Sequence, residues 1–252
     1  MKHIIYIVLL SFASFATAQN NILFEEGNEL YNQGDYRKAL EKYEKILETN
    51  QHSAELYFNL GNANYKLNNI APSIFYYEKA LMLNPNDKDI KNNIAFAKNM
   101  TIDAIDVVPE VGFAKLLNNG TNVMSYDNWA IFSVIMVILF VVLFLIYFFS
   151  YSSNQKRIAF ISSVVSITIA VFTVAFAFHK YNLDKLDKPA IVFAKESQVK
   201  SEPNLRSNEA FTLHEGTKVQ VLDTLNNWKK IKLSDGKIGW ISSDDIKLLK
   251  NF

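Results

Sequence analysis

Hydrophobic residues gather in three uninterrupted stretches. The first, Ile4–Phe15, follows Met1-Lys2-His3 and precedes Ala16-Thr17-Ala18. It is too short to span a bilayer, which takes about 20 apolar residues. A basic start, an apolar middle and an A-x-A cleavage pattern predict a secretory signal peptide over residues 1–18. An uncleaved anchor is the alternative, and the cleavage pattern argues against it.

The second and third stretches are long enough to cross a membrane as helices. No charged residue occurs from Asn128 to Gln155 or from Ile158 to Phe178. A helix rises about 1.5 Å per residue, so roughly 21 residues cross the hydrocarbon core. We predict transmembrane helices over 128–150 and 158–179, joined by a loop over 151–157. An ion pathway is not expected, because no charge lies at mid-membrane.

The charges beside these helices predict their orientation. The loop carries Lys156 and Arg157, whereas Asp127 and Asp184 lie outside the outer ends. Positively charged loops stay in the cytoplasm. The large segments 19–127 and 180–252 are therefore expected on the opposite side of the membrane. The signal peptide independently predicts the same placement for the first of them.

The segment after the signal peptide contains an internal repeat with a spacing of 34 residues. The aligned positions carry identical residues: Gly27 and Gly61, Tyr31 and Tyr65, Tyr43 and Tyr77, Lys45 and Lys79. This period and these residue types resemble tetratricopeptide repeats. The resemblance implies an all-α solenoid of paired helices that pack closely across small residues. Ile46 and Gln51 depart from the family's pattern, which has a small residue and a proline there.

A further helix is expected to close the solenoid. Ile90, Ile94 and Ala97 recur on one helical face after Asp87-Lys88-Asp89. Terminal repeats must cover the apolar face of their neighbour, so this helix is a cap. The repeat module is therefore predicted over 20–100, followed by a linker over 101–127. Phe113–Leu117 within the linker either lies on the membrane surface or belongs to a flexible connector.

The resemblance also places a binding surface. In this family the first helix of each repeat lines a concave, peptide-binding face, which here carries Asn28, Tyr31, Asn32, Asn59, Asn62, Tyr65 and Lys66. Asparagine offers a donor and an acceptor to a peptide backbone, and tyrosine adds contact area. Packing between helices is the alternative for both tyrosines. A clamp for a carboxylate is not expected, because Phe24, Asp89 and Asn93 stand where that subfamily has basic residues.

From Pro189 the chain changes to short runs of alternating apolar and polar residues, separated by turns such as Asp235-Gly236. This pattern predicts a small all-β barrel over 189–250, after a linker over 180–188. The motifs Val199–Pro203 and Asp235–Trp240 resemble those of bacterial SH3-like domains. The resemblance implies that the module binds peptides or cell-wall fragments, or that it acts only as a rigid spacer. Trp228 and Trp240 are the candidate groove residues, and packing in the core is the alternative for both.

Composition excludes several kinds of chemistry. The chain has no cysteine, so it cannot form disulfides or thiolate metal sites. The four histidines lie on separate elements, and no nucleophile elbow, phosphate loop or zinc-protease motif occurs. With 26 basic and 25 acidic residues, the charge does not favour nucleic acid. We expect no enzyme, metal or cofactor. The repeat module is acidic and the C-terminal segment basic, but screening over roughly 8–10 Å means that charge alone predicts no contact between them.

The order of these parts resembles the BatE-like proteins of the Bacteroides aerotolerance cluster. The resemblance implies an inner-membrane protein with both modules in the periplasm. It also implies partners: membrane-bound von Willebrand A-domain proteins and, indirectly, a MoxR-type ATPase. Two functional hypotheses follow. The repeats form a scaffold that binds protein partners in an envelope-stress complex, or the SH3-like module binds or senses peptidoglycan.

Overall fold

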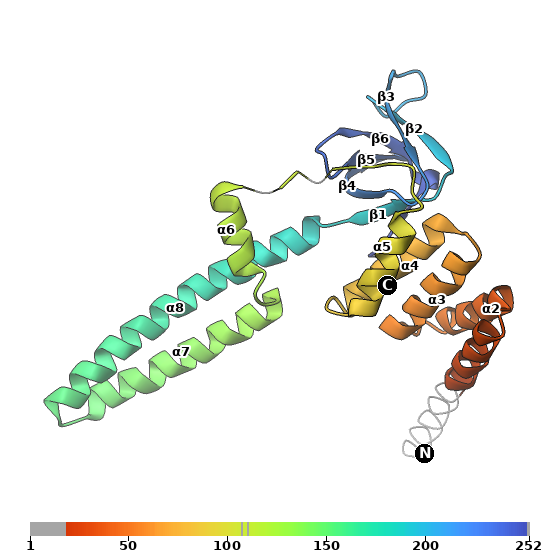
Figure 1. Cartoon of the computed structure of the whole chain (residues 1–252). Helices are drawn as coiled ribbons and strands as arrows, with labels where there is room; N and C mark the ends of the chain where they lie inside the picture. Colours follow the sequence, from red (N-terminus) through yellow and green to blue (C-terminus); the bar gives the residue numbers. More distant parts are fainter. Residues whose placement is uncertain (1–18, 107, 110, 251–252) are drawn as a thin grey trace, which may run out of the picture. The chain divides into compact units, whose positions relative to one another are not determined.

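The computed structural model describes residues 19–106, 108–109 and 111–250, which form two compact units. One unit joins the helices before residue 107 to the strands after residue 187, and the other is Val108–Asp187 (Figure 1). The predicted signal peptide, residues 1–18, lies outside the described residues.

The repeat module consists of a first helix at 19–32 followed by α2 (Tyr36–Glu48), α3 (Ala54–Lys66), α4 (Ile70–Leu83) and α5 (Lys88–Lys98). Asp35, Ser53 and Asp87 start α2, α3 and α5, and each accepts a hydrogen bond from a backbone N–H of the first turn. Such caps satisfy donors that the helix itself leaves unpaired. The predicted all-α repeats with a closing helix are confirmed.

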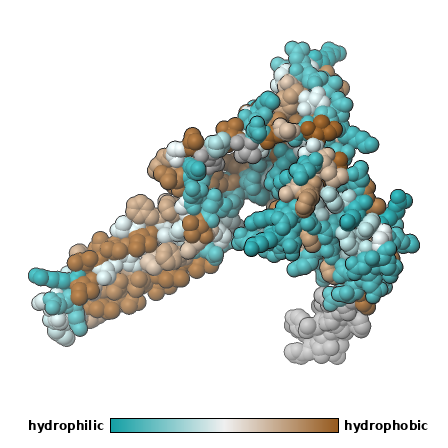
Figure 2. Space-filling view, viewed as in Figure 1, coloured by the Kyte–Doolittle hydropathy of each residue, from teal (hydrophilic) through white to brown (hydrophobic). Residues whose placement is uncertain are grey.

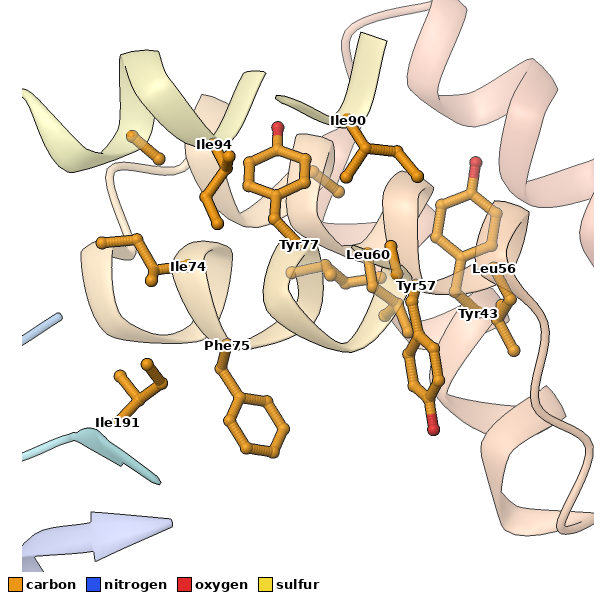
Figure 3. Close-up of a cluster of buried hydrophobic side chains, with 14 of the residues drawn as sticks. Tyr43, Leu56, Tyr57, Leu60, Ile74, Phe75, Tyr77, Ile90, Ile94 and Ile191 are labelled. Carbon is orange, nitrogen blue, oxygen red and sulfur yellow. The ribbon is translucent and has the colours of Figure 1, made fainter. Parts of the chain in front are cut away.

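Tyrosines fill the interior of this module. Tyr43, Tyr57 and Tyr77 are each about 1% exposed and pack among Leu60 and Ile74 (Figure 3). Tyr43 and Tyr77 lie against Gly27 and Gly61, one repeat apart. The absence of a side chain on each glycine gives the ring its space.

The C-terminal module is an antiparallel sheet of seven strands in the order β3-β2-β6-β5-β4-β1-β7. The strands are β1 (Pro189–Val192), β2 (Glu196–Lys200), β3 (Glu209–His214), β4 (Lys218–Leu225), β5 (Trp228–Lys232), β6 (Ile238–Ser242) and β7 (Ile246–Leu248). Buried residues alternate along β2, β4 and β6 and point to one core that contains Val199, Val221 and Ile241. This confirms the predicted all-β module.

The two modules share a hydrophobic interface within the first unit. Ile191 of β1 and Leu249 are fully buried in the core of the helical repeats. The rings of Phe75 on α4 and Phe193 meet edge to face at 5.5 Å. Figure 3 shows Ile191 beside Phe75. The strands therefore cover one side of α4, which would otherwise expose apolar surface to water.

Polar contacts surround that interface. Glu78 is 6% exposed and accepts hydrogen bonds from Lys98 at 2.9 Å and from Lys218 of β4 at 2.7 Å. Asp103 accepts from the hydroxyl of Thr217 at 2.6 Å and from the backbone N–H of His214 at 2.7 Å. The two modules thus meet through the ion pair of Glu78 with Lys218, and Asp103 adds hydrogen bonds to His214 and Thr217.

The second unit contains α6 (Gly112–Thr121) and a hairpin of α7 (Tyr126–Phe149) and α8 (Ser153–Leu186). Both hairpin helices are long and apolar enough to cross a membrane. Ser133 of α7 donates to the carbonyl of Ala170, and Ser166 of α8 donates to that of Met136. Figure 2 shows the apolar surface along this hairpin and the polar surface at its loop end.

The structure differs from the sequence prediction at the ends of these helices. The segment predicted as a linker over 101–127 contains α6, and α7 already begins at Tyr126. The helix predicted over 158–179 is longer at both ends: α8 begins at Ser153, inside the predicted loop 151–157, and continues to Leu186, inside the predicted linker 180–188. A Lys180–Asp184 ion pair of 2.9 Å, spaced i, i+4, stabilises this polar extension.

Candidate partner-binding groove

Hydrogen bonds join neighbouring repeats on the face that the sequence assigned to binding. The side-chain oxygen of Asn28 accepts from the hydroxyl of Tyr43 at 2.8 Å and from the amide of Asn59 at 2.9 Å. Asn28 lies on the first helix and Asn59 on α3. One carbonyl oxygen therefore ties the first helix of one repeat to the first helix of the next.

The same triad recurs one repeat later. The side-chain oxygen of Asn62 accepts from the hydroxyl of Tyr77 at 2.6 Å and from the amide of Asn93 at 2.8 Å. Each member lies 34 residues after its counterpart in the first triad. The closing helix α5 thus continues the repeat pattern in its hydrogen bonds as well as in its packing.

Burial keeps the tyrosines of these triads protonated. It raises the pKa of Tyr43 to about 12 and raises that of Tyr77 further. Their hydroxyls are therefore donors at neutral pH, and each Asn oxygen is the acceptor. The two donors fix the oxygen of each Asn, so its side-chain NH₂ group points away from them. That NH₂ group can donate to a carbonyl oxygen of a bound chain.

A hollow of about 200 Å³ opens beside the second triad. Its lining residues combine aromatic rings, amides and one cation: Tyr31, Asn62, Tyr65, Lys66, Tyr77, Asn93 and Phe96. Phe96 is 59% exposed, which is unusual for a phenylalanine outside a membrane or an interface. The hollow offers apolar area for a side chain and polar groups for a backbone.

The structure brings together four of the seven predicted groove residues. Tyr31, Asn62, Tyr65 and Lys66 line the hollow. Asn28 and Asn59 belong to the first triad, and Asn32 is exposed near the end of the first helix. Tyr31 also packs edge to face on Tyr36 at 5.1 Å, so it combines a structural role with exposure to the hollow.

Sequence reasoning missed Asn93 and Phe96 as groove residues. Both lie on α5, which the sequence identified as a cap, and Asn93 was considered only as a departure from the carboxylate clamp. The 34-residue repeat spacing could have identified both residues. Asn93 follows Asn59, and Phe96 follows Asn62, by one 34-residue period.

The SH3-like module presents its own candidate surface. Trp228 and Trp240 are both half-buried, so neither belongs to the core. In the paired strands β5 and β6, Lys230 lies opposite Trp240, with its Nζ 6.0 Å from the centre of the indole ring. Side chains two residues apart share a face of a strand. Trp228, Lys230 and Trp240 therefore share the outer face of the sheet, with Lys200 of β2 paired to Trp240.

Comparison with known proteins agrees with both modules. Residues 27–68 match the TPR repeat family, residues 54–87 match the tetratricopeptide repeat family, and residues 196–247 match the bacterial SH3 domain family. Protein O-mannosyl-transferase TMTC1 of Homo sapiens is 32% identical over 76 residues, which is 30% of this chain and 9% of that protein. The Mus musculus protein of the same name is 32% identical over 76 residues, 8% of its length. The chain thus spans less than a tenth of these relatives.

Proposed function

We propose that this protein is a membrane-anchored scaffold whose repeat groove holds an extended segment of a protein partner. The hollow beside Asn62 carries this proposal, because it joins an oriented amide to the half-buried ring of Tyr65 and the exposed ring of Phe96. Tetratricopeptide repeats support the class of function. The acidic balance of the module makes a basic or neutral partner electrostatically easier than an acidic one.

The orientation belongs to the same proposal: both modules lie outside the cytoplasm, in the periplasm of a bacterial inner membrane. Their docking supports one shared side, since Glu78 and Lys218 contact each other although the hairpin separates them in the chain. A hairpin of two spans returns the chain to the side from which it entered. The cytoplasmic end is then the one where α8 begins, since the start of α8 carries Lys156 and Arg157.

The proposed partners and cellular role rest on the resemblance to BatE-like proteins. We propose von Willebrand A-domain membrane proteins as the direct partners and a MoxR-type ATPase as an indirect one, in a complex for aerotolerance or envelope stress. The protein contributes binding and not catalysis in this proposal.

The experiment is cross-linked affinity purification of the full chain from membranes. The test variant carries Lys66→Ala and Phe96→Ala, two groove residues outside the triads. Its control carries Leu83→Ala and Lys91→Ala, which remove an exposed apolar and an exposed basic side chain outside the hollow. Partner recovery should fall about tenfold or more in the test variant, as for loss of an anchor residue. Equal partner recovery with the test and control variants would refute the groove as the binding site.

Peptidoglycan binding by the SH3-like module is a second candidate. The half-buried indoles of Trp228 and Trp240 on the outer face of the sheet, beside Lys230 and Lys200, favour it, because rings and cations suit a polar glycan-peptide polymer carrying carboxylates. The full chain in detergent should sediment with peptidoglycan, and Trp228→Ala with Trp240→Ala should abolish this. Leu205→Ala, an 83% exposed residue of the same module, is the control.

A further inference from the structure

The short helix α6 has an apolar face that no described side chain covers. Phe113 is 77% exposed and Leu116 is 71% exposed, and they lie on one face because they are three residues apart. Val123, just after the helix, is 72% exposed. Lys115 lies on a different side of the helix, because it is two residues from Phe113 and one from Leu116. The more buried side of the helix carries Leu117, which is half-buried, and Thr121, which is fully buried.

Three hydrogen bonds fix α6 to the hairpin. The indole N–H of Trp129 donates to the carbonyl of Thr121 at 3.0 Å. The Nε2 of His179 lies 3.2 Å from the side-chain oxygen of Asn118, and Lys180 donates to that of Asn122 at 2.9 Å. Figure 1 shows α6 running across α8 and not along it.

These bonds lie where the apolar surface of the hairpin ends. Trp129 opens the apolar stretch of α7, and His179 directly follows the uncharged stretch of α8. Tyr126 and Tyr181 meet edge to face at 5.6 Å at the same end. Tryptophan and tyrosine concentrate at the level of the lipid headgroups. The hydrogen bonds therefore hold α6 at the boundary of the bilayer.

We propose that α6 is an interfacial helix whose exposed face, Phe113 and Leu116, is buried in lipid at the boundary between headgroups and acyl chains. A helix that crosses the span at this level lies along the membrane surface, and its apolar side continues the lipid-facing surface of the hairpin. Lys115 then faces headgroups and water. This inference takes the hairpin as membrane-spanning and needs neither a groove partner nor wall binding.

The lack of native cysteine permits a direct test. Full-length Leu116→Cys, Lys115→Cys and Val142→Cys variants are labelled with an environment-sensitive dye and reconstituted into phosphatidylethanolamine–phosphatidylglycerol vesicles. Val142 is 48% exposed on α7 and reports insertion of the spans. The Leu116 label should be quenched by shallow lipid nitroxides and resist aqueous iodide about threefold better than the Lys115 label. Phe113→Cys should repeat the result.

Two outcomes separate this inference from the membrane anchor itself. If the Val142 label is quenched by lipid nitroxides while the Leu116 and Phe113 labels are as open to iodide as the Lys115 label, the interfacial helix is refuted and the span stands. If Val142 is also open to iodide, the hairpin does not insert, and the inference fails together with the anchor.

Discussion

Gly61 and Tyr77 lie so close that a Cβ on Gly61 would stand 2.6 Å from two carbons of the tyrosine ring. Gly27 and Tyr43 show the same relationship one repeat earlier, at 2.5 Å. Real Cβ atoms do not approach carbons so closely, so the ring occupies space that only glycine leaves. The hydroxyl of the same ring then reaches Asn62 at 2.6 Å. Close packing and groove geometry are thus linked through one side chain.

Gly61→Ala should destabilise the repeats by about 1–3 kcal/mol, the usual cost of overpacking a tight interior. Pulse proteolysis of the full chain in urea measures the change. Gly120→Ala is the control, because nothing lies within 4 Å of its added Cβ. That control should be neutral or stabilising by up to about 1 kcal/mol, since alanine favours a helix over glycine. Equal stability of the Gly61 variant and the parent would contradict the packing argument.

Tyr77→Phe removes the hydroxyl that holds Asn62. The free energy of unfolding should fall by about 0.5–1.5 kcal/mol, the net value of a hydrogen bond. Partner recovery should also fall, because the amide of Asn62 loses one of its two orienting bonds. Tyr76→Phe is the matched control, since among the described residues no side-chain hydrogen bond of the Tyr76 hydroxyl is seen. Recovery that falls equally in both variants would point to general destabilisation.

The contact between the modules should weaken in acid. Burial alone would raise the pKa of Glu78, but Lys218 and Lys98 outweigh it and hold this pKa below its ordinary value of 4.5. A lowered pKa in the folded state gives stability that is present above about pH 4.5 and is lost as the pH falls through the folded pKa. The protection factors of the Val192 and Phe193 amides, which compare each exchange rate with the intrinsic rate at the same pH, should therefore fall between about pH 5 and pH 3.

Glu78→Gln should remove most of that pH dependence. It should also cost about 1–2 kcal/mol at neutral pH, a modest value because both lysines are about half exposed. Glu48→Gln, on the exposed surface of α2, should keep the parent profile. An unchanged profile in the Glu78 variant would assign the acid response to another group, such as Asp103.

The serine bonds of the hairpin should contribute modestly to helix pairing. Ser133→Ala with Ser166→Ala removes both interhelical bonds and should lower hairpin stability by about 1–2 kcal/mol in total. Titration of the full chain from lipid bicelles into denaturing detergent measures this. Thr168→Ala is the control, because Thr168 donates to Val164 of its own helix at 2.8 Å. A loss as large in the control would contradict the assignment to interhelical bonding.

Sequence periodicity predicted each module, because it reports which residues of one element face inward. The 34-residue spacing identified the repeats, and alternation identified the strands. Sequence patterns predicted the ends of these elements less accurately. The apolar stretch stops before His179, but α8 continues for residues that favour helix and carry the Lys180–Asp184 pair. The end of the apolar stretch therefore does not predict the end of the helix.

Contacts between distant elements could not be predicted from local patterns. Glu78 looked like an ordinary helical carboxylate, and its partner Lys218 is 140 residues away. Asn93 was assigned to the groove only when α5 was seen beside α3. Its spacing of 34 residues from Asn59 could have revealed this role, whereas nothing local in β1 marks Ile191 as part of the helical core.

The contact of Ile191 and Phe193 with α4 closes the chain into a loop that contains the apolar hairpin. Two separate backbone segments lead from the docked modules to the hairpin, one before α6 and one before β1. In the proposed membrane anchor, a pulling force from a partner in the groove would be divided between these two tethers while the contact holds. Once the contact opens, the segment after α5 alone would carry the load. The shared apolar interface would thus set how much tension reaches the hairpin.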